Sequence, residues 1–256
     1  PEFAPWDVLQ EWLVNLPVLQ VFTAERMAYY NALRQLEPPH TARFQNPYRE
    51  WIGAQIRADL WGWICPGNPG LAAELAYRDA AVSHVKNGIY GEIFIAAAIA
   101  ASFVVDTAAE AIRIGLEYIP QSSRLAEAIR EVFRMYEEIR DFESAVDRLY
   151  ELYGRYHWVH TINNAALVTA ALLYSEGDYE RGITYAVAGG WDTDCNGATV
   201  GSILGVIHGA DRLPEKWIAP LRNTIRTSLR GFDRTTFPEL AARTVTLAQR
   251  FSLDRR

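Results

Sequence analysis

Apolar residues recur along most of the chain at the three- and four-residue spacing of an amphipathic helix, and no segment alternates apolar and polar residues long enough to predict a strand. Proline and glycine residues end these segments, and the connections between them are short. The apolar, alanine-rich stretch from Leu71 to Phe103 is expected to supply central helices. The pattern predicts an all-α protein, with helices at residues 5–15, 22–36, 47–63, 70–83, 88–105, 107–118, 122–139, 142–153, 161–175, 178–188, 196–209, 214–229 and 235–251.

The length and composition of the chain fit one globular domain that spans residues 1–256. Half of the 256 residues are hydrophobic, which is enough for a sizeable core and excludes a disordered or fibrous protein. No repeat of fixed period is present, which argues against a solenoid. Cys65 and Cys195 lie far apart and have no partners at metal-ligand spacing, so we expect neither a disulfide framework nor a cysteine zinc site.

The formal net charge of −6 excludes a broad electrostatic attraction to nucleic acids or to anionic membranes. Basic residues are scattered among acidic ones, and no run of them forms a basic patch in the sequence. The longest apolar stretch, Ile93 to Val105, is too short to cross a bilayer, and no signal segment opens the chain. We therefore expect a cytoplasmic protein with no nucleic-acid and no membrane partner.

Glycine recurs every four residues in one later segment, as Gly197, Gly201, Gly205 and Gly209. This spacing puts the glycines on one face of a helix, where the backbone can approach a neighbouring helix closely. Each glycine costs about 1 kcal/mol relative to alanine in a helix interior, so a stripe of them needs compensating packing. We expect this face to be buried.

Two aspartates precede this helix, and their spacing points to metal chemistry. Asp192 and Asp194 are two residues apart in a loop that follows Gly189 and Gly190, and an extended backbone would project both side chains to the same side. Two carboxylates on one side repel each other unless a cation lies between them, and oxygen ligands suit Mg²⁺, Mn²⁺ or Ca²⁺. The alternative is that one aspartate caps the following helix and the other is solvated.

A second group of polar residues interrupts the apolar region that follows Leu71. Asp79, His84 and Asn87 lie among alanine, valine and isoleucine residues. Buried polar groups need hydrogen-bond partners, so these side chains either bind one another or line a pocket. The residues alone favour neither interpretation.

Taken together, these segments resemble the ADP-ribosylglycohydrolase family, and within it the dinitrogenase reductase activating glycohydrolases, from about Asp7 to Gln249. Members of that family share a compact, orthogonal multi-helix fold and a two-metal centre that usually holds Mg²⁺ or Mn²⁺. The segment from Gly190 to Gly209 is similar to the family's Gly-Gly-Asp-Thr-Asp-Thr motif and the small-residue helix after it. The resemblance implies metal ligands at Asp192, Asp194 and Cys195, and substrate-binding residues at Asp79, His84, Asn87, Gly88, Tyr90 and Trp191.

Two further segments carry the resemblance. The stretch from Asp79 to Gly91 looks like the family's Asp-Ala-x-x-x-(Ser/Thr)-His segment, which implies that His84 lies in the substrate cleft. The segment from Gly53 to Arg57 looks more weakly like a Gly-x-x-Met-Arg element of the family, which implies a place near the ribose-phosphate side of the substrate.

The chain departs from the family pattern at three places. Trp191 stands where the family usually has its second glycine, and Cys195 replaces a metal-contacting threonine or serine. A neutral thiol is a poor ligand for a hard cation, so one metal would lose a ligand or take a water molecule instead. The family's N-terminal Thr-Asp-Asp metal motif does not occur in this sequence. We expect that Pro1 is not the native start and that the domain is truncated at its N-terminus, which would favour a homo-oligomer.

The remaining polar and aromatic cluster runs from His157 to Asn164. His157 and His160 are three residues apart, but no third metal ligand is evident. We therefore favour capping of the following helix by Thr161 or Asn163 over a metal site here. The resemblance places Asn163 and Asn164 at the start of the helix before the Asp192 loop, where they would orient that loop.

The resemblance implies an enzyme that hydrolyses an N- or O-glycosidic bond at the anomeric carbon of an ADP-ribosyl group or a related ribosyl compound. Its substrate would be a small molecule or a protein-linked ADP-ribosyl group, and the residues leave the general base unassigned. Two alternatives stay open. One is a non-catalytic relative with a binding or structural role, and the other is a hydrolase of another nucleoside or glycoside that uses the same metal centre.

Overall fold

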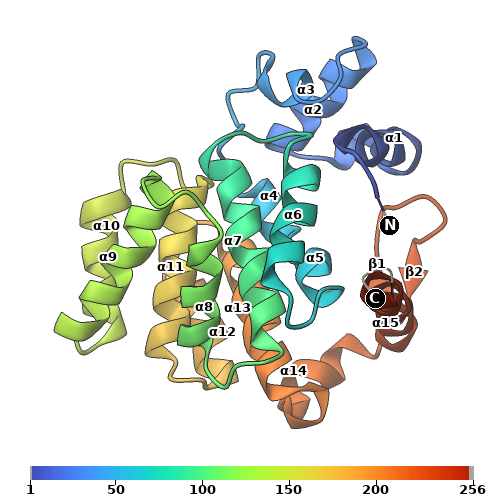
Figure 1. The fold of residues 1–256 in the computed structure, drawn as a ribbon. Coiled ribbons are helices and arrows are strands. Elements are labelled where there is room, and N and C mark those ends of the chain that lie inside the picture. The colour runs from blue at the N-terminus through green and yellow to red at the C-terminus, as the bar shows by residue number, and fades with distance from the viewer. Residues whose placement is uncertain (1, 254–256) are drawn as a thin grey trace.

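The structure, a computed structural model, describes residues 2–253 and is mostly helical with almost no strand, which confirms the all-α prediction. Its helices (Figure 1) are α1 (Pro5–Asn15), α2 (Thr23–Leu33), α3 (His40–Arg43), α4 (Gly53–Ile56), α5 (Asp59–Trp63), α6 (Pro69–Ala80), α7 (Asn87–Ser102), α8 (Ala108–Glu117), α9 (Arg124–Glu138), α10 (Phe142–Tyr153), α11 (Thr161–Tyr174), α12 (Tyr179–Ala188), α13 (Thr193–His208), α14 (Glu215–Ile218) and α15 (Phe237–Leu253). The 3-10 turns are η1 (Val18–Gln20), η2 (Ala210–Arg212) and η3 (Ala219–Leu221).

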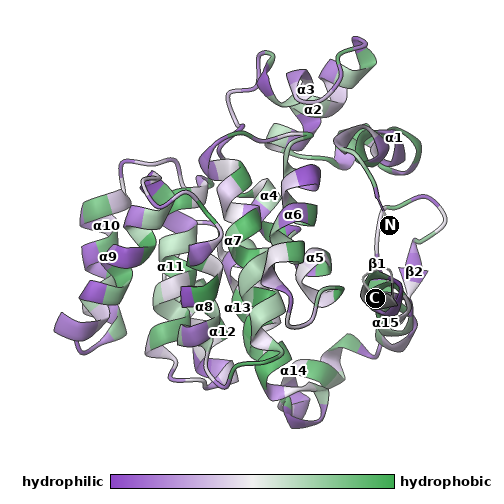
Figure 2. Cartoon of the chain, viewed as in Figure 1, coloured by the Kyte–Doolittle hydropathy of each residue, from purple (hydrophilic) through white to green (hydrophobic). Residues whose placement is uncertain are grey.

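Two helices, α7 and α11, form the centre of the fold. Every residue of α11 is buried, and so is α7 from Gly91 to Ser102. Helix α7 packs against α6, α8, α5 and α4, whereas α11 packs against α9, α10, α12 and α13. Figure 2 shows the difference in colour, because α7 and α11 are mostly white and green while purple residues mark α9 and α10. The prediction that the alanine-rich stretch supplies central helices is confirmed.

Most of the predicted helices begin and end within a turn of the observed ones, but the helix predicted at residues 47–63 is wrong. Two short helices, α4 and α5, stand in its place, and residues 47–52 form turns. Tertiary contacts explain the difference. The backbone N–H of Ile52 donates to the carbonyl of Val159 at 2.9 Å, and Trp51 and His160 form an isolated β-bridge. These long-range bonds hold the segment out of a helix.

The helix predicted at residues 214–229 is also wrong. The chain there forms α14 and η3 and then enters a two-stranded antiparallel hairpin of β1 (Ile225–Arg226) and β2 (Arg234–Thr235). Pro220 lacks a backbone N–H, and Arg222 and Asn223 both have positive φ, at 48° and 51°. These two features end the helical path before β1.

The glycine stripe faces α12, as the close-packing prediction requires. A Cβ at Gly197 would lie 3.1 Å from a methyl of Val187, and one at Gly201 would lie 3.5 Å from Ile183. Only Gly197 is fully buried, and Gly209 lies beyond the helix at its C-cap with φ 75°. The stripe is therefore an interhelical contact that is half-buried toward its end. Among the described residues, no helix combines the length and apolarity needed to cross a membrane.

Candidate functional site

The loop between α12 and α13 has a backbone conformation that residues other than glycine rarely adopt. Gly190 and Trp191 both have positive φ, at 83° and 52°. A Cβ at Gly190 would lie 2.6 Å from the hydroxyl oxygen of Tyr150, so only glycine fits there. Trp191 is held in a conformation that favours glycine, and its ring stacks on Tyr150 with centroids 4.5 Å apart. Strain of this kind at a non-glycine residue is typical of a functional loop.

This loop brings three potential metal ligands together at the start of α13. One ligand atom from each of Asp192, Asp194 and Cys195 lies within 4.8 Å of the others, while Asp192 is buried and Asp194 is exposed. Burial, with a contribution from Asp194, raises the pKa of Asp192 to about 6. Asp192 is the N-cap residue of α13, but its side chain makes no capping hydrogen bond. The arrangement therefore favours cation binding over the capping alternative.

The donor set suits a hard divalent cation only in part. Two carboxylates are appropriate ligands for Mg²⁺ or Mn²⁺. Burial and the adjacent Asp192 carboxylate raise the pKa of the Cys195 thiol, so the sulfur keeps its proton. A protonated thiol is a poor ligand for a hard cation, so the two aspartates are better suited than Cys195 to hold one.

Asn164 holds this loop in position from α11. Its side-chain oxygen accepts hydrogen bonds from the backbone N–H of Asp192 at 3.1 Å and from Nδ2 of Asn196 at 2.8 Å. Its own Nδ2 donates to the carbonyls of Trp158 and His160, both at 2.8 Å. All these contacts are buried or partly buried. These bonds agree with the expectation for Asn164, whereas Asn163 donates to the carbonyl of His157 and makes no hydrogen bond with the loop among the described residues.

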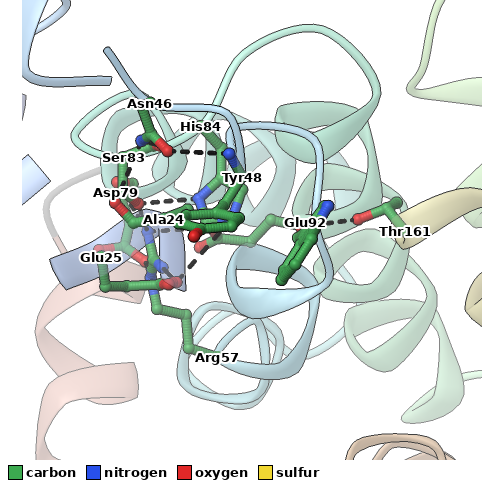
Figure 3. A network of polar contacts seen from close by, with 11 residues as sticks. Ala24, Glu25, Asn46, Tyr48, Arg57, Asp79, Ser83, His84, Glu92 and Thr161 are labelled. Atoms are coloured by element: carbon green, nitrogen blue, oxygen red, sulfur yellow. Dashed lines mark hydrogen bonds and ion pairs between the residues drawn. The ribbon is translucent and has the colours of Figure 1, made fainter. Parts of the chain in front are cut away.

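A cluster of charged side chains surrounds Arg57, which is the C-cap residue of α4 (Figure 3). Its Nε donates to a carboxylate oxygen of Asp79 at 2.6 Å, and its Nη1 donates to Glu25 at 2.5 Å. Nη2 donates to the carbonyl of Asp79 and to the hydroxyl of Ser83. The guanidinium also lies over the ring of Trp12, 5.0 Å from its centroid. Because its donors are committed inside the protein, Arg57 is a structural residue here and not a free phosphate ligand.

The same cluster holds two buried groups with atoms that lack partners. Glu92 has no exposed side-chain surface and lies 3.8 Å from Nη2 of Arg57 as an ion pair, but neither of its carboxylate oxygens makes a hydrogen bond among the described residues. Burial and the nearby Asp79 raise the pKa of Glu92 well above its usual value. Burial and Arg57 lower the pKa of His84 well below its usual value, so its imidazole is neutral. Nδ1 of His84 lies 2.8 Å from the Ser83 hydroxyl, and Nε2 lies 4.0 Å from Glu25.

Asp79 and His84 thus belong to one network, which connects them through Arg57 and Ser83. His84 also lines a cavity beside α3, so both interpretations of this segment apply in part. Sequence reasoning missed Glu25 altogether. Its carboxylate occupies the space that a Cβ on Gly53 would need, so a side chain at Gly53 would displace Glu25 from Arg57. Helix α4, which has Arg57 as its C-cap, packs against α13, so the cluster and the aspartate loop lie on neighbouring helices.

The remaining predicted substrate residues lie in the first turn of α7 and are engaged inside the fold. Nδ2 of Asn87 donates to Glu50 at 2.8 Å, while its side-chain oxygen accepts from the backbone N–H of Leu125 at 3.2 Å. A Cβ at Gly88 would lie 2.6 Å from the carbonyl of Arg49. Tyr90 is half-buried and packs against the core. These contacts link α7 to neighbouring segments.

An aromatic stack lies beside the aspartate loop. The Trp51 ring stacks on His157 with centroids 4.3 Å apart and planes 12° apart. The ring of Tyr48 is tilted against Trp51, with centroids 4.5 Å apart. Trp51 also packs against the small buried cluster that contains Cys195. Through Trp51, this partly exposed group of three rings adjoins Cys195.

The cap of α11 differs from the prediction. Nδ1 of His160 accepts a hydrogen bond from the backbone N–H of Ile162 at 3.2 Å, so His160 is the capping residue in place of Thr161 or Asn163. Burial lowers the pKa of His160 to about 4, which keeps Nδ1 free to accept. In the part of the chain that the structure describes, the group around Asp192 is the candidate metal cluster, and neither His157 nor His160 belongs to one.

A sequence model of a protein family, described as ADP-ribosylglycohydrolase, matches residues 1–254. The chain belongs to the ADP-ribosylglycohydrolase family. The resemblance found in the Asp192 and Asp79 segments is therefore confirmed. This family acts on ADP-ribosylated substrates and is generally metal-dependent. No curated protein matches the chain.

Proposed function

We propose that the protein is a metal-dependent hydrolase that cleaves the glycosidic bond at the anomeric carbon of an ADP-ribosyl group. The observation that carries this proposal is the convergence of Asp192 and Asp194 at the start of α13, in a chain of the ADP-ribosylglycohydrolase family. Mg²⁺ or Mn²⁺ would be held by these two carboxylates. When bound, such a cation supplies positive charge that binds ribose hydroxyls and lowers the pKa of a coordinated water molecule.

The protein's own residues would fix the position of the substrate around this centre. Asn164 holds the backbone of Asp192, and Trp191 extends from the strained loop onto Tyr150. The stack of Trp51 and His157 offers a flat aromatic surface for the base of a nucleotide. A substrate with both a ribose and a nucleobase therefore fits this surface better than a simple sugar does.

The first experiment is calorimetric titration of ADP-ribose into the protein, with Mg²⁺ and then with a chelator. We expect binding that needs the cation and that is lost in Asp192→Asn and Asp194→Asn. Asp211→Asn, an exposed aspartate in η2, is the matched control and should bind like the wild type.

Measurements of substrate turnover distinguish the proposed hydrolase from a non-catalytic relative and from a hydrolase of another nucleoside or glycoside. The release of ADP-ribose from an ADP-ribosylated peptide, dependent on the cation and on Asp192, supports the hydrolase. Cation-dependent binding without turnover of any ribosyl substrate would favour a non-catalytic relative. Turnover of other nucleosides in preference to ADP-ribosyl compounds would favour the second alternative.

A further inference from the structure

A second cavity lies between α3 and the turn that joins α6 to α7. Its volume is about 470 Å³, and its lining includes Pro39, Arg43, Arg49, Tyr77, Lys86 and Ile89. None of its lining residues belongs to the aspartate loop or to the aromatic stack beside it. His84 forms part of the wall, and Nε2 of this residue faces Glu25.

Positive charge is concentrated in this cavity. Three basic side chains line it and no carboxylate does, although the whole chain carries a net charge of −6. Over the described residues, Arg43, Arg49 and Lys86 form no ion pair with any aspartate or glutamate, whereas Arg57, Arg78, Arg124, Arg148 and Arg181 all do. Like charges that share a cavity repel one another, so this arrangement favours an anionic ligand.

The backbone holds two of these cations in place. Nη1 of Arg49 donates to the carbonyl of Asn46 at 2.9 Å, and the carbonyl of Arg49 accepts from the backbone N–H of Val85 at 2.9 Å. Lys86 follows Val85 in the chain and has φ 48° and ψ −123°, a backbone conformation that favours glycine.

Helix α7 adds to the positive field. Lys86 is the N-cap residue of this helix, which spans Asn87–Ser102, and the N-terminus of a helix carries a partial positive charge. Backbone N–H groups at such an end favour phosphate groups. Lysine and arginine side chains together with a helix N-terminus match the chemistry of a phosphate oxyanion better than that of a carboxylate.

We infer that this cavity binds a small phosphorylated compound with an aromatic or apolar body, at a site separate from Asp192 and Asp194. The volume exceeds what a phosphate ion alone requires and lies in the range of small-ligand pockets. Tyr77 is half-exposed and Ile89 lies beside it in the lining, which provides a surface for a base or another ring. A nucleoside monophosphate has both parts.

The test is calorimetric titration of adenosine monophosphate and of inorganic phosphate into the full chain, in a phosphate-free buffer with a chelator. We expect both ligands to bind, with the nucleotide binding more tightly. Lys86→Gly removes the charge and relieves the backbone strain, so it should weaken nucleotide binding about tenfold while the protein keeps or gains thermal stability. Arg43→Ser should weaken binding similarly. Arg34→Ser removes an exposed cation outside the cavity and should leave binding unchanged.

Tyr77→Ala tests the ring surface and should reduce nucleotide affinity to that of phosphate. Wild-type protein that binds neither ligand, or binding that Lys86→Gly and Arg43→Ser leave unchanged, would overturn the inference. A loss of Mg²⁺-dependent ADP-ribose binding in Lys86→Gly would also overturn it, because the cavity would then belong to the site at Asp192. Unchanged ADP-ribose binding together with lost nucleotide binding supports two separate sites.

Discussion

The side-chain oxygen of Asn164 accepts a hydrogen bond from the backbone N–H of Asp192 at 3.1 Å. This bond crosses from α11 to the loop before α13 and lies in the buried interior. A metal centre needs ligands whose positions are fixed by surrounding hydrogen bonds. Asn164 meets this need, because it binds the backbone of one ligand and the side chain of Asn196 in the same helix.

Asn164→Ala should therefore weaken Mn²⁺ binding about tenfold or more, since outer contacts of this kind contribute that much to metal affinity. The neighbouring Asn163→Ala is a matched control. Nδ2 of Asn163 donates to the carbonyl of His157, and among the described residues its side chain makes no hydrogen bond with the aspartate loop. Both variants lose a buried amide, so both should lose thermal stability. Equal Mn²⁺ affinities in the two variants, measured by calorimetry, would contradict the role given to Asn164.

The two cysteines allow a test of the metal ligands. Cys195→Ser replaces a protonated thiol with a hydroxyl oxygen, which is a better ligand for a hard cation. We expect tighter Mg²⁺ binding and faster turnover in this variant. Cys65→Ser makes the same change at a buried site away from the loop and should lower stability without changing Mg²⁺ affinity. An unchanged affinity in Cys195→Ser would show that this position does not reach the cation.

The aspartate loop could be predicted from the sequence because its information is local. Asp192 and Asp194 are two residues apart and lie at the start of one helix, so spacing alone brings them together. The charged cluster could not be predicted in this way. Glu25 and Arg57 are separated by 32 residues, and their contact depends on how α2 packs against α4.

Asn87 shows a different limit of sequence reasoning. A polar residue in an apolar stretch indicates that a partner exists, but it does not identify the partner. For Asn87 the partners are Glu50 and the backbone of Leu125, which are far away in the chain. The basic cavity was missed for the same reason, because Arg43, Arg49 and Lys86 are scattered in sequence and meet only in the fold.

The buried Glu92 predicts a dependence of stability on pH. Burial and Asp79 raise its pKa in the folded state, so the folded protein binds this proton more tightly than the unfolded chain does. Its contribution to stability is present below the unfolded pKa of about 4.3 and is lost as the pH rises through the raised folded pKa. Glu92→Gln replaces the carboxyl group with an uncharged amide that does not titrate, so it removes this dependence on pH.

We expect wild type and Glu92→Gln to differ little in melting temperature at low pH, and the variant to become the more stable of the two as the pH rises. Glu117→Gln, on the exposed face of α8, should follow the wild type at every pH. Melting curves between acid and mildly alkaline pH would measure this. A constant difference between wild type and Glu92→Gln across the range would mean that Glu92 does not change protonation on folding.

The position of Arg57 among carboxylates predicts that its replacement greatly lowers the stability of the protein. Arg57→Met leaves the carboxylates of Glu25 and Asp79 close together without their cation. Removal of one partner from a buried ion pair typically costs about 3–5 kcal/mol. Arg148→Met, which removes an exposed pair with Glu151, should change the melting temperature little. Chemical denaturation of both variants tests this, and similar losses in the two would refute a special role for the Arg57 cluster.

The position of Trp51 predicts that its replacement weakens substrate binding without slowing the chemical step. Its ring stacks on His157 beside the cluster that contains Cys195, where it would bind the base of the substrate. Loss of such a stack costs about 1 kcal/mol, so Trp51→Ala should raise KM several-fold and leave kcat largely unchanged. Trp63→Ala, at the end of α5, is the matched control and should keep the wild-type KM. Turnover of a ribosyl substrate that lacks the base should be insensitive to Trp51→Ala. If that substrate and the complete one lost turnover equally, Trp51 would act on the metal loop and not on the base.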